Sequence, residues 1–390
     1  MQWNSIRTKI LAALIACLLL GLAGILALMN YSFERNSQIL AAESVSGAQK
    51  LFSILEAREI GKMTAVSDTL LANPQIRDAF VARDRDRLKA LTAPLYVQLK
   101  RQGITNWMFH SSPDMTVFLR AHNPPKFGDH LNRYLDRQVV ATNSLVTGNE
   151  LAKAGFALRI IRPFYDAQGG VTGYVELGEE LGQFIHAMKA QTGSDFGILL
   201  AKKYLDRQMW ADSSAVWHRR DNWNDNPEFV VADKTSDSDN LLSFQGELSH
   251  LPAQGQVAER FQQGDSVLVR GIFPIYDAAG HTVGAMFVVR DISSFYLAMR
   301  HTRNVLVLAT IAALAVGILL VLALLNRLVF RRLRHIIRVA TRVVGGDYQS
   351  EIPVDSHDEV GELELLFEQF RRIFVDLLTS VPELQERERA

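Results

Sequence analysis

Two long apolar runs constrain this chain more than any other feature of its sequence. Residues 10–29 and residues 305–325 contain no charged side chain over 20 and 21 consecutive positions. At about 1.5 Å per helical residue, each run covers roughly 30 Å, the thickness of a bilayer's hydrocarbon core. A buried helix of a soluble protein rarely stays uncharged over such a length, so both runs predict membrane-spanning helices.

Basic side chains set the expected orientation of these two spans. Arg7 and Lys9 precede the first run, and five arginines follow the second. Positive flanks stay in the cytoplasm, which predicts that both termini lie inside and residues 31–304 outside. The pattern is that of a two-span protein of the bacterial inner membrane with a periplasmic middle part. The five arginines are Arg327, Arg331, Arg332, Arg334 and Arg338.

The first run has two alternative interpretations. A cleaved signal peptide is disfavoured, because the run is long and lacks a clear small-residue cleavage site. The sequence Leu14-Ile15-Ala16-Cys17 resembles a lipoprotein processing site, but three leucines follow where lipoproteins usually turn polar. Cys17 is therefore interpreted as a lipid-facing or helix-packing residue, with lipidation as the lesser alternative. It is the only cysteine, so an intrachain disulfide is excluded.

Composition and motifs argue against several function classes. Lys+Arg and Asp+Glu both number 42, so no net charge attracts nucleic acid. The sequence has no phosphate-binding loop, zinc-ligand spacing or haem-attachment motif, and we expect neither a cofactor nor a catalytic site. His110, His122 and His130 lie close in sequence but give only weak evidence for a metal site.

The outer region contains a repeated hairpin. The segments 159–173 and 270–284 match at a constant offset, 270 − 159 = 111. In each copy an apolar strand enters an Asp-Ala-x-Gly turn and a second strand leaves it, over residues 171–177 and 282–289. Two such hairpins at fixed spacing predict two related α/β modules in tandem. The matched pairs are Arg159/Arg270, Pro163/Pro274, Tyr165/Tyr276, Asp166/Asp277, Ala167/Ala278, Gly169/Gly280 and Gly173/Gly284.

The segment before the first hairpin completes the expected fold. Residues 31–72 favour one long helix, Asn73-Pro74 breaks it, and shorter helices follow to about residue 102. Residues 104–110 and 115–122 read as strands. A long helix followed by an antiparallel sheet, in two successive modules, resembles the double Cache domain of bacterial receptors. The expected fold class is α+β, with tandem PAS-like Cache modules on a long helix, two transmembrane helices and a helical coiled coil.

Residues 109–163 narrow this resemblance to the double sensory domain of two-component sensors. The similarity extends over roughly residues 45–295 and is carried mainly by the first module. The Arg…Trp-Tyr motif of amino-acid-binding Cache receptors is not visible, so amino acids are not the favoured ligand. The residues that carry the resemblance are Phe118, Leu119, Arg120, His122, Pro124, Phe127, Gly128, Asp129, Leu131, Gly148, Glu150, Gly155 and Arg159.

After the second apolar run, two helical seams predict a signal-relay domain. Apolar residues recur at coiled-coil spacing in 329–343 and again in 360–377, joined by a Gly-Asp linker and Asp358-Glu359-Val360-Gly361-Glu362. Two such seams imply a dimeric parallel four-helix bundle. The pattern resembles the HAMP domain, with Arg332 in place of the family's proline and Glu368 in place of its asparagine.

These observations predict a transmembrane receptor that senses a small extracytoplasmic ligand and relays the signal through HAMP to a cytoplasmic output. The expected partners are the lipid membrane, a second copy of the chain and an output protein or domain. The alternative is the sensory part of a histidine kinase or diguanylate cyclase whose catalytic domain is missing from this chain. The predicted boundaries are 1–9 cytoplasmic, 10–30 first span, 31–304 sensor (modules about 45–180 and 190–295), 305–325 second span, 326–379 HAMP and 380–390 tail.

The candidate ligand site lies in the first module. Strand alternation is expected to place Phe118, Arg120 and His122 on one face, with Arg159 on a neighbouring strand. Two arginines and a histidine favour a small anionic ligand. An internal bridge to Asp129 or Glu150 would satisfy an arginine equally well. The predicted site residues are Trp107, Phe118, Arg120, His122, Asp129, Glu150 and Arg159.

Overall fold

The computed structural model describes residues 6–152, 155–216, 219–236, 248–354 and 358–387. The chain divides into two compact units. Residues 35–298 form the first, and residues 1–34 with residues 299–390 form the second. Each unit is considered by itself.

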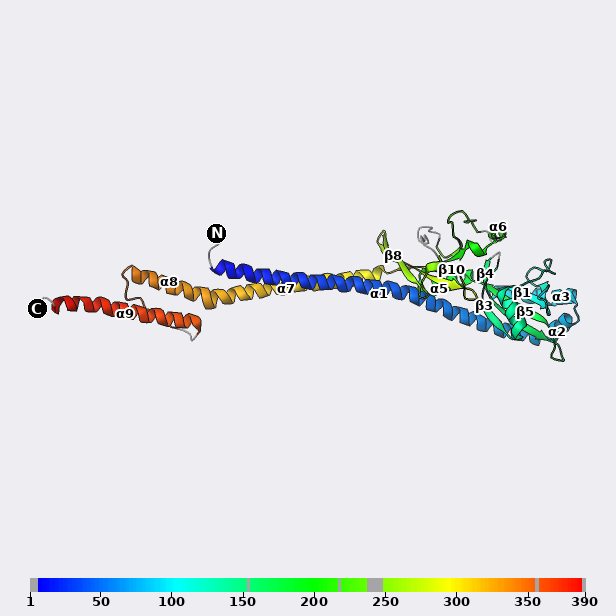
Figure 1. Cartoon of the computed structure of the whole chain (residues 1–390), viewed down its shortest axis with the longest axis horizontal. Coiled ribbons are helices and arrows are strands. Elements are labelled where there is room, and N and C mark those ends of the chain that lie inside the picture. Colours follow the sequence, from blue (N-terminus) through cyan, green and yellow to red (C-terminus); the bar gives the residue numbers. More distant parts are fainter. Residues whose placement is uncertain (1–5, 153–154, 217–218, 237–247, 355–357, 388–390) are drawn as a thin grey trace. The chain divides into compact units, whose positions relative to one another are not determined.

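Two five-stranded antiparallel sheets make up the unit of residues 35–298 (Figure 1). The first sheet has the order β2-β1-β5-β4-β3 and the second the order β7-β6-β10-β9-β8, so the two modules share one topology. This confirms the tandem α+β fold. The strands of the first sheet are β1 (Ile104–Ser111), β2 (Val117–Arg120), β3 (Val146–Ala152), β4 (Gly155–Tyr165) and β5 (Val171–Glu180). Those of the second are β6 (Asp195–Ala201), β7 (Phe229–Lys234), β8 (Gln256–Gln263), β9 (Ser266–Tyr276) and β10 (Thr282–Asp291).

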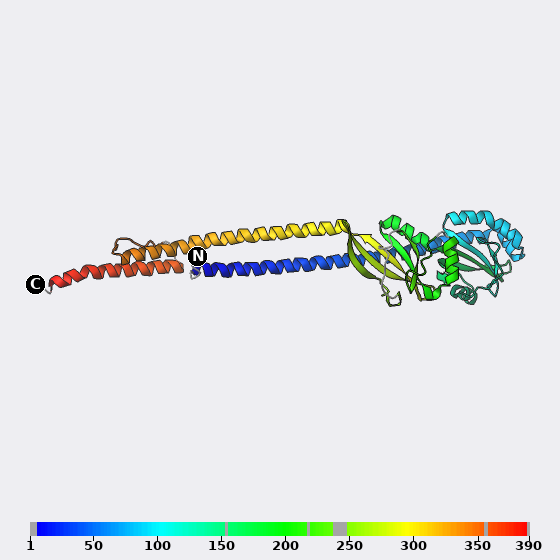
Figure 2. The same cartoon turned by 90° about the horizontal axis from the view of Figure 1, so that it is seen from above.

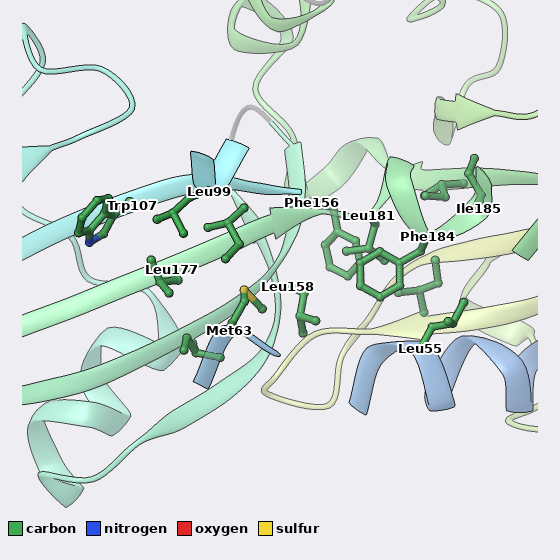
Figure 3. Close-up of a cluster of buried hydrophobic side chains, with 14 of the residues drawn as sticks. Leu55, Met63, Leu99, Trp107, Phe156, Leu158, Leu177, Leu181, Phe184 and Ile185 are labelled. Carbon is green, nitrogen blue, oxygen red and sulfur yellow. The ribbon is translucent and has the colours of Figure 1, made fainter. Parts of the chain in front are cut away.

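The helix α1 (Ile6–Ala72) packs along both sheets of this unit (Figures 1 and 2). Several of its buried residues, Val45, Phe52 and Met63 among them, belong to one apolar core shared by the two modules. The approach of α1 to the second sheet is close, since a side chain on Gly271 of β9 would overlap Val45. Figure 3 shows this core from Trp107 and Leu99 at one end to Phe184, Ile185 and Leu55 at the other.

Short helices complete the modules. Asn73 ends α1 and caps α2 (Pro74–Val81), since its side chain accepts hydrogen bonds from the backbone of Gln75 and Ile76. The predicted break at Asn73-Pro74 is therefore confirmed. The helix α5 (Gly182–Thr192) connects the two sheets and buries Phe184, Ile185 and Met188. The remaining helices are α3 (Arg85–Arg101), α4 (Tyr134–Thr142) and α6 (Arg207–Val216), with short 3₁₀ turns at Lys202–Tyr204 and Leu248–His250.

The repeated hairpins form as predicted. In both turns the Asp backbone and side chain organise the loop: Asp166 Oδ1 accepts from Gln168 and Gly170, and Asp277 Oδ1 from Ala279 and His281. The two turns differ in their surroundings. The first is exposed, whereas Ala278 of the second packs against apolar residues of the first module.

The second unit is helical. It contains the first part of α1, most of α7 (Ser293–Leu325), a π-helical turn (Asn326–Phe330), α8 (Arg331–Val344) and α9 (Glu359–Arg387). The helices α1 and α7 are each long and apolar enough to cross a membrane, with mean hydropathy of 2.0 and 3.0 in their most apolar windows. Ile336 and Val339 of α8 are buried, whereas aromatic residues of the predicted seam on α9 are exposed.

The two unusual positions of the relay domain both form ion pairs. Arg332 of α8 pairs with Glu364 of α9 and, at 3.0 Å, with Asp358. Glu368 of α9 accepts a hydrogen bond from the backbone N–H of Ile352 at 3.1 Å and pairs with Arg371 at 2.7 Å. Both positions thus tie α9 to another part of the domain.

Candidate functional site

The two faces of the first sheet have opposite character. One face packs on the helices and carries Trp107, Phe109 and Leu177, all fully buried. On the other face, paired positions of adjacent strands bring charged residues together, because Met108 of β1 lies opposite both Arg120 of β2 and Glu176 of β5. This second face is a candidate site because buried charges need specific partners.

Glu176 lies at the centre of this charged face and is fully buried. Its Oε2 is 3.0 Å from His110 Nε2 and 2.5 Å from Arg133 Nη2, and its Oε1 is 2.5 Å from Arg159 Nη1. A carboxylate, two guanidinium groups and an imidazole thus meet at one point. We call Glu176, Arg133, Arg159, His110, Asp136 and Glu150 the Glu176 cluster.

The residues around α4 hold Arg133 in place. Asp136 accepts hydrogen bonds from Arg133 Nε at 2.9 Å, from Nη2 at 2.8 Å and from its backbone N–H at 2.8 Å. Glu150 of β3 accepts from the backbone N–H of Leu135 at 2.9 Å, and its Oε2 lies 3.4 Å from Arg133 Nε and 3.7 Å from Arg159 Nε. The start of α4 is therefore bonded to both β5 and β3 through the cluster.

Burial and charge act in opposite directions on the two glutamates. Burial alone would raise the pKa of Glu176, but the charges of Arg133 and Arg159 outweigh it and hold that pKa well below its usual range. Burial raises the pKa of Glu150, and Arg133 only partly offsets this effect. Glu176 is therefore ionised at neutral pH, while Glu150 takes up a proton more readily than an exposed glutamate does.

Arg120 has a carboxylate partner within the protein. Its guanidinium forms two hydrogen bonds to Asp129, of 2.6 and 2.7 Å, and a third, of 2.9 Å, to the backbone carbonyl of Lys126. The hydrogen bond from Arg120 lowers the pKa of Asp129 to about 2. This bidentate pair is the internal bridge that the sequence left open as an alternative to ligand binding, and it fixes the segment after β2 onto the sheet.

Two predicted site residues, Phe118 and Trp107, lie on the helix side of the first sheet. A bulge in the pairing of β1 and β2 falls at Phe118, whose ring centre lies 5.6 Å from that of Phe80 of α2. The prediction that Phe118 and Arg120 share a face was therefore wrong. Trp107 also lies in the helix-side core. His122 follows the end of β2, with Nδ1 3.2 Å from the backbone oxygen of Trp107.

The expected neighbourhood of Arg159 was also wrong. Arg159 lies on β4, and both β5 and β1 separate β4 from β2 in the sheet. The strands β4 and β5 form the hairpin, and β5 pairs with β1, so β4 cannot reach β2. Glu176 lies on β5, between the strands that carry Arg120 and Arg159. It pairs with Arg159, whereas Arg120 pairs with Asp129.

The sequence reasoning missed Glu176 and Arg133. Glu176 was detectable in principle as the one acid in the apolar strand 171–177, where burial requires a cationic partner. Arg133 precedes α4 outside any strand, so no periodicity marked it. The three histidines considered for metal binding lie apart: His110 contacts Glu176, His122 the Trp107 backbone and His130 the hydroxyl of Thr116. No group of metal-ligating side chains was found among the described residues.

A cavity of about 190 Å³ adjoins the Glu176 cluster at Arg159. Phe156 and Arg159 of the first sheet line it, together with Ile198 and Leu200 of the second sheet and Trp210 of α6. Ser213 and Ser214 of α6 and Asn106 of β1 add polar groups, and Glu180, Asp233 and Arg219 complete the charged lining. Arg159 is thus the residue that belongs to both the cluster and the cavity.

Comparison with known proteins finds two family matches in the chain. Residues 58–229 match the family described as the double sensory domain of two-component sensor kinases, and residues 324–372 match the HAMP domain. A search of curated proteins finds no significant match.

Several solved sensor domains are similar in fold. The periplasmic domain of Vibrio cholerae LuxQ is 12% identical, with a TM-score of 0.39, and covers 65% of this chain and 99% of its own. The ligand-binding domain of the Campylobacter jejuni chemoreceptor Tlp3, solved with L-valine, is 9% identical, with a TM-score of 0.37 and coverage of 68% and 96%. The sensor domain of the V. cholerae histidine kinase DctB is 11% identical, with a TM-score of 0.37 and coverage of 68% and 97%.

The chain is a transmembrane sensing receptor, because a double sensory domain of the Cache type is followed by a HAMP domain. It is located in the inner membrane, with two helices able to span the membrane on either side of a sensor domain of the periplasmic type in the sequence. The fold, the class of protein and the localisation predicted from the sequence are confirmed.

Proposed function

We propose that this receptor detects a small molecule in the cavity beside Arg159 and relays its binding through a HAMP homodimer to a cytoplasmic output. The observation that carries the proposal is that one cavity has walls from both sensory modules and from the Glu176 cluster. A molecule bound there contacts the first sheet, α6 and the second sheet at once. Its binding energy can therefore favour one arrangement of the two modules over another.

The charges of the cavity bear on the class of ligand. Arg159 pairs with Glu176, and Arg219 lies 3.8 Å from both Glu180 and Asp233. A lone anion would have to draw an arginine from its carboxylate, which leaves a buried charge uncompensated. An uncharged or zwitterionic molecule with an apolar body avoids this cost. The preference for an anionic ligand that the sequence suggested stays a prediction, which the experiment below tests.

The test uses four molecules that share a benzene ring and differ in charge: benzyl alcohol, benzoate, benzylamine and the zwitterion 4-(aminomethyl)benzoate. Each is added to the full-length receptor in nanodiscs, and the melting temperature of the sensor domain is followed. We expect the alcohol or the zwitterion to raise the melting temperature by mass action and benzoate to have little effect. A response to benzoate alone would favour the anion instead.

Two variants locate the binding site. Ala157→Met fills the cavity from β4 and should abolish the response, whereas Ala167→Met in the exposed first turn should leave it unchanged. An equal response in Ala157→Met and in the wild type would place binding elsewhere and contradict the cavity assignment. Arg159→Lys keeps the charge opposite Glu176, so it tests the role of the guanidinium without removing the ion pair.

The homodimer is proposed from the relay domain. Phe367, Phe370 and Phe374 of α9 are 38%, 65% and 39% exposed in the single chain. These three exposed rings recur at coiled-coil spacing on α9, which pairs with α8 of the same chain. The same two helices of a second copy would cover the rings in a four-helix bundle. We further propose that the chain acts by moving these helices and carries no catalytic site of its own.

A further inference from the structure

The turn between β9 and β10 of the second module docks onto the first module at β3 and at the apolar cluster beside it. The backbone N–H of Ala278 donates a 2.7 Å hydrogen bond to the carbonyl of Asn149 in β3. Ala278 also packs against an apolar cluster of the first module that contains Leu135, Val139 and Tyr174. The fit is close, because a side chain on Gly148 would lie 2.8 Å from the Cβ of Ala278. This contact joins the two modules independently of the cavity.

Asn149 contacts a third element through its side chain. The residue is buried, at 7% exposure, and its amide donates a hydrogen bond to Glu56 of α1. The next residue in the strand is Glu150, which bonds the start of α4 and approaches Arg133 and Arg159 in the Glu176 cluster. One dipeptide of β3 therefore touches the cluster, the long helix and the second module.

We infer that Asn149 is a positioning residue that couples the charged cluster of the first module to the β9–β10 hairpin and to α1. A change in the cluster moves Glu150 and therefore also the adjoining carbonyl of Asn149. The β9–β10 turn moves with this carbonyl, because Ala278 is hydrogen-bonded to it. From that turn, β10 runs to Asp291, and α7 begins two residues later at Ser293. Ser293 is itself bonded to the sheet, since its Oγ accepts from the N–H of Val267 at 2.7 Å. The turn, the strand and the start of α7 thus form one continuous path.

The repeat supplies a matched control for this path. Ala278 and Ala167 occupy the same position, the second residue of an Asp-Ala-x-Gly turn closed by a bond from the Gly N–H to the Asp carbonyl. Proline is favoured at this position of a tight turn, and it removes the N–H donor. Ala278→Pro therefore breaks the bond to Asn149, while Ala167→Pro makes the same change in a turn that is exposed.

The test perturbs the cluster by substitution and needs no ligand, so its result is independent of the cavity proposal. Glu150→Gln is introduced into the full-length receptor in nanodiscs, and amide hydrogen exchange is measured over residues 278–282 and 293–298. We expect exchange in both segments to rise several-fold in the wild-type and Ala167→Pro backgrounds. In the Ala278→Pro background, Glu150→Gln should add no further change at residues 293–298.

Two outcomes would overturn the inference. One is that Glu150→Gln changes exchange at residues 293–298 equally with and without Ala278→Pro. The other is that it changes nothing there in the wild-type background. Arg159→Lys serves as a second perturbation of the cluster should Glu150→Gln fail to fold. The contact between Asn149 and α1 is tested separately with Glu56→Ala. In this background, Glu150→Gln should no longer change amide exchange over residues 53–60 but should still change it over residues 278–282.

Discussion

At the scale of single residues, the first sheet buries several charged side chains, among them Glu150, Arg159 and Glu176. Glu176 is fully buried and contacts two guanidinium groups, so its carboxylate compensates charges that would otherwise be stranded in the interior. Removing one partner of a buried network costs more than the pair contributes, because the remaining charges keep their desolvation penalty.

We therefore predict that Glu176→Gln destabilises the sensor domain strongly. Leaving Arg133 and Arg159 without this carboxylate should cost about 3–5 kcal/mol. The melting temperature of the sensor domain should fall by roughly 10 °C in a thermal scan. Glu179→Gln is the comparison, because Glu179 of the same strand pairs with Lys62 of α1 outside the cluster. A smaller loss in Glu176→Gln than in Glu179→Gln would contradict the central role of Glu176.

Asp129 predicts a specific dependence on pH. Its pKa is about 2 in the folded protein, below the value near 3.8 of a free aspartate, because Arg120 bonds its ionised form. The stabilisation is therefore complete above the unfolded pKa and is lost as the pH falls toward the folded value. The melting-temperature difference between wild type and Asp129→Asn should shrink between about pH 6 and pH 2.5. A difference that stays constant over this range would show that the ionised pair is unimportant.

At the scale of elements, sequence patterns predicted the helices and turns that depend on residues nearby in the chain. The long helix, its break at Asn73-Pro74 and both hairpins follow from apolar periodicity and from turn residues whose partners lie within a few positions. The bulge at Phe118, by contrast, depends on how β2 pairs with β1, which strand alternation alone does not encode. That single irregularity moved Phe118 to the opposite face from Arg120.

The candidate site was less predictable for the same physical reason. Arg120 and Arg159 were recognised from their positions in predicted strands, and a bridge to Asp129 or Glu150 was the alternative considered. The partner of Arg159 depended on strand order, which places β5 between β4 and β1. Arg133 reaches the sheet only because α4 folds over it, a long-range contact without a local sequence signal.

We call the segment that joins α8 to α9 in the relay domain the connector, and it gives a prediction at the scale of elements. Glu368 binds the backbone of Ile352 and the side chain of Arg371, and Arg371 in turn donates to the carbonyl of Tyr348 at 2.6 Å. Glu368→Ala should therefore free the connector, and amide exchange over residues 348–354 should become about ten-fold faster. Arg372→Ala is the control, because Arg372 contacts Glu368 but its side chain is 69% exposed. Equal effects of the two substitutions would exclude Glu368 as the anchor.

At the scale of the whole molecule, the proposed homodimer is the assembly that would cover the aromatic row of α9. In a Cys17→Ser background, single cysteines at Phe367 or Phe370 should cross-link two receptors in the membrane, whereas a cysteine at Arg372 should not. The seam positions face the partner helix in a parallel bundle, and Arg372 points away from it. Cross-linking that is equal at all three positions, or absent from both seam positions, would argue against the four-helix bundle.

The docked turn at Ala278 also has an evolutionary consequence. The two turns share the pattern Asp-Ala-x-Gly. Among the described residues, the alanine of the second turn has a neighbouring strand against its methyl group, whereas the first turn is exposed. After a duplication, position 167 would be released to vary, while position 278 would remain small and change only together with Gly148. The two copies should therefore diverge at unequal rates, and the slower copy is the one whose alanine has become part of the other module.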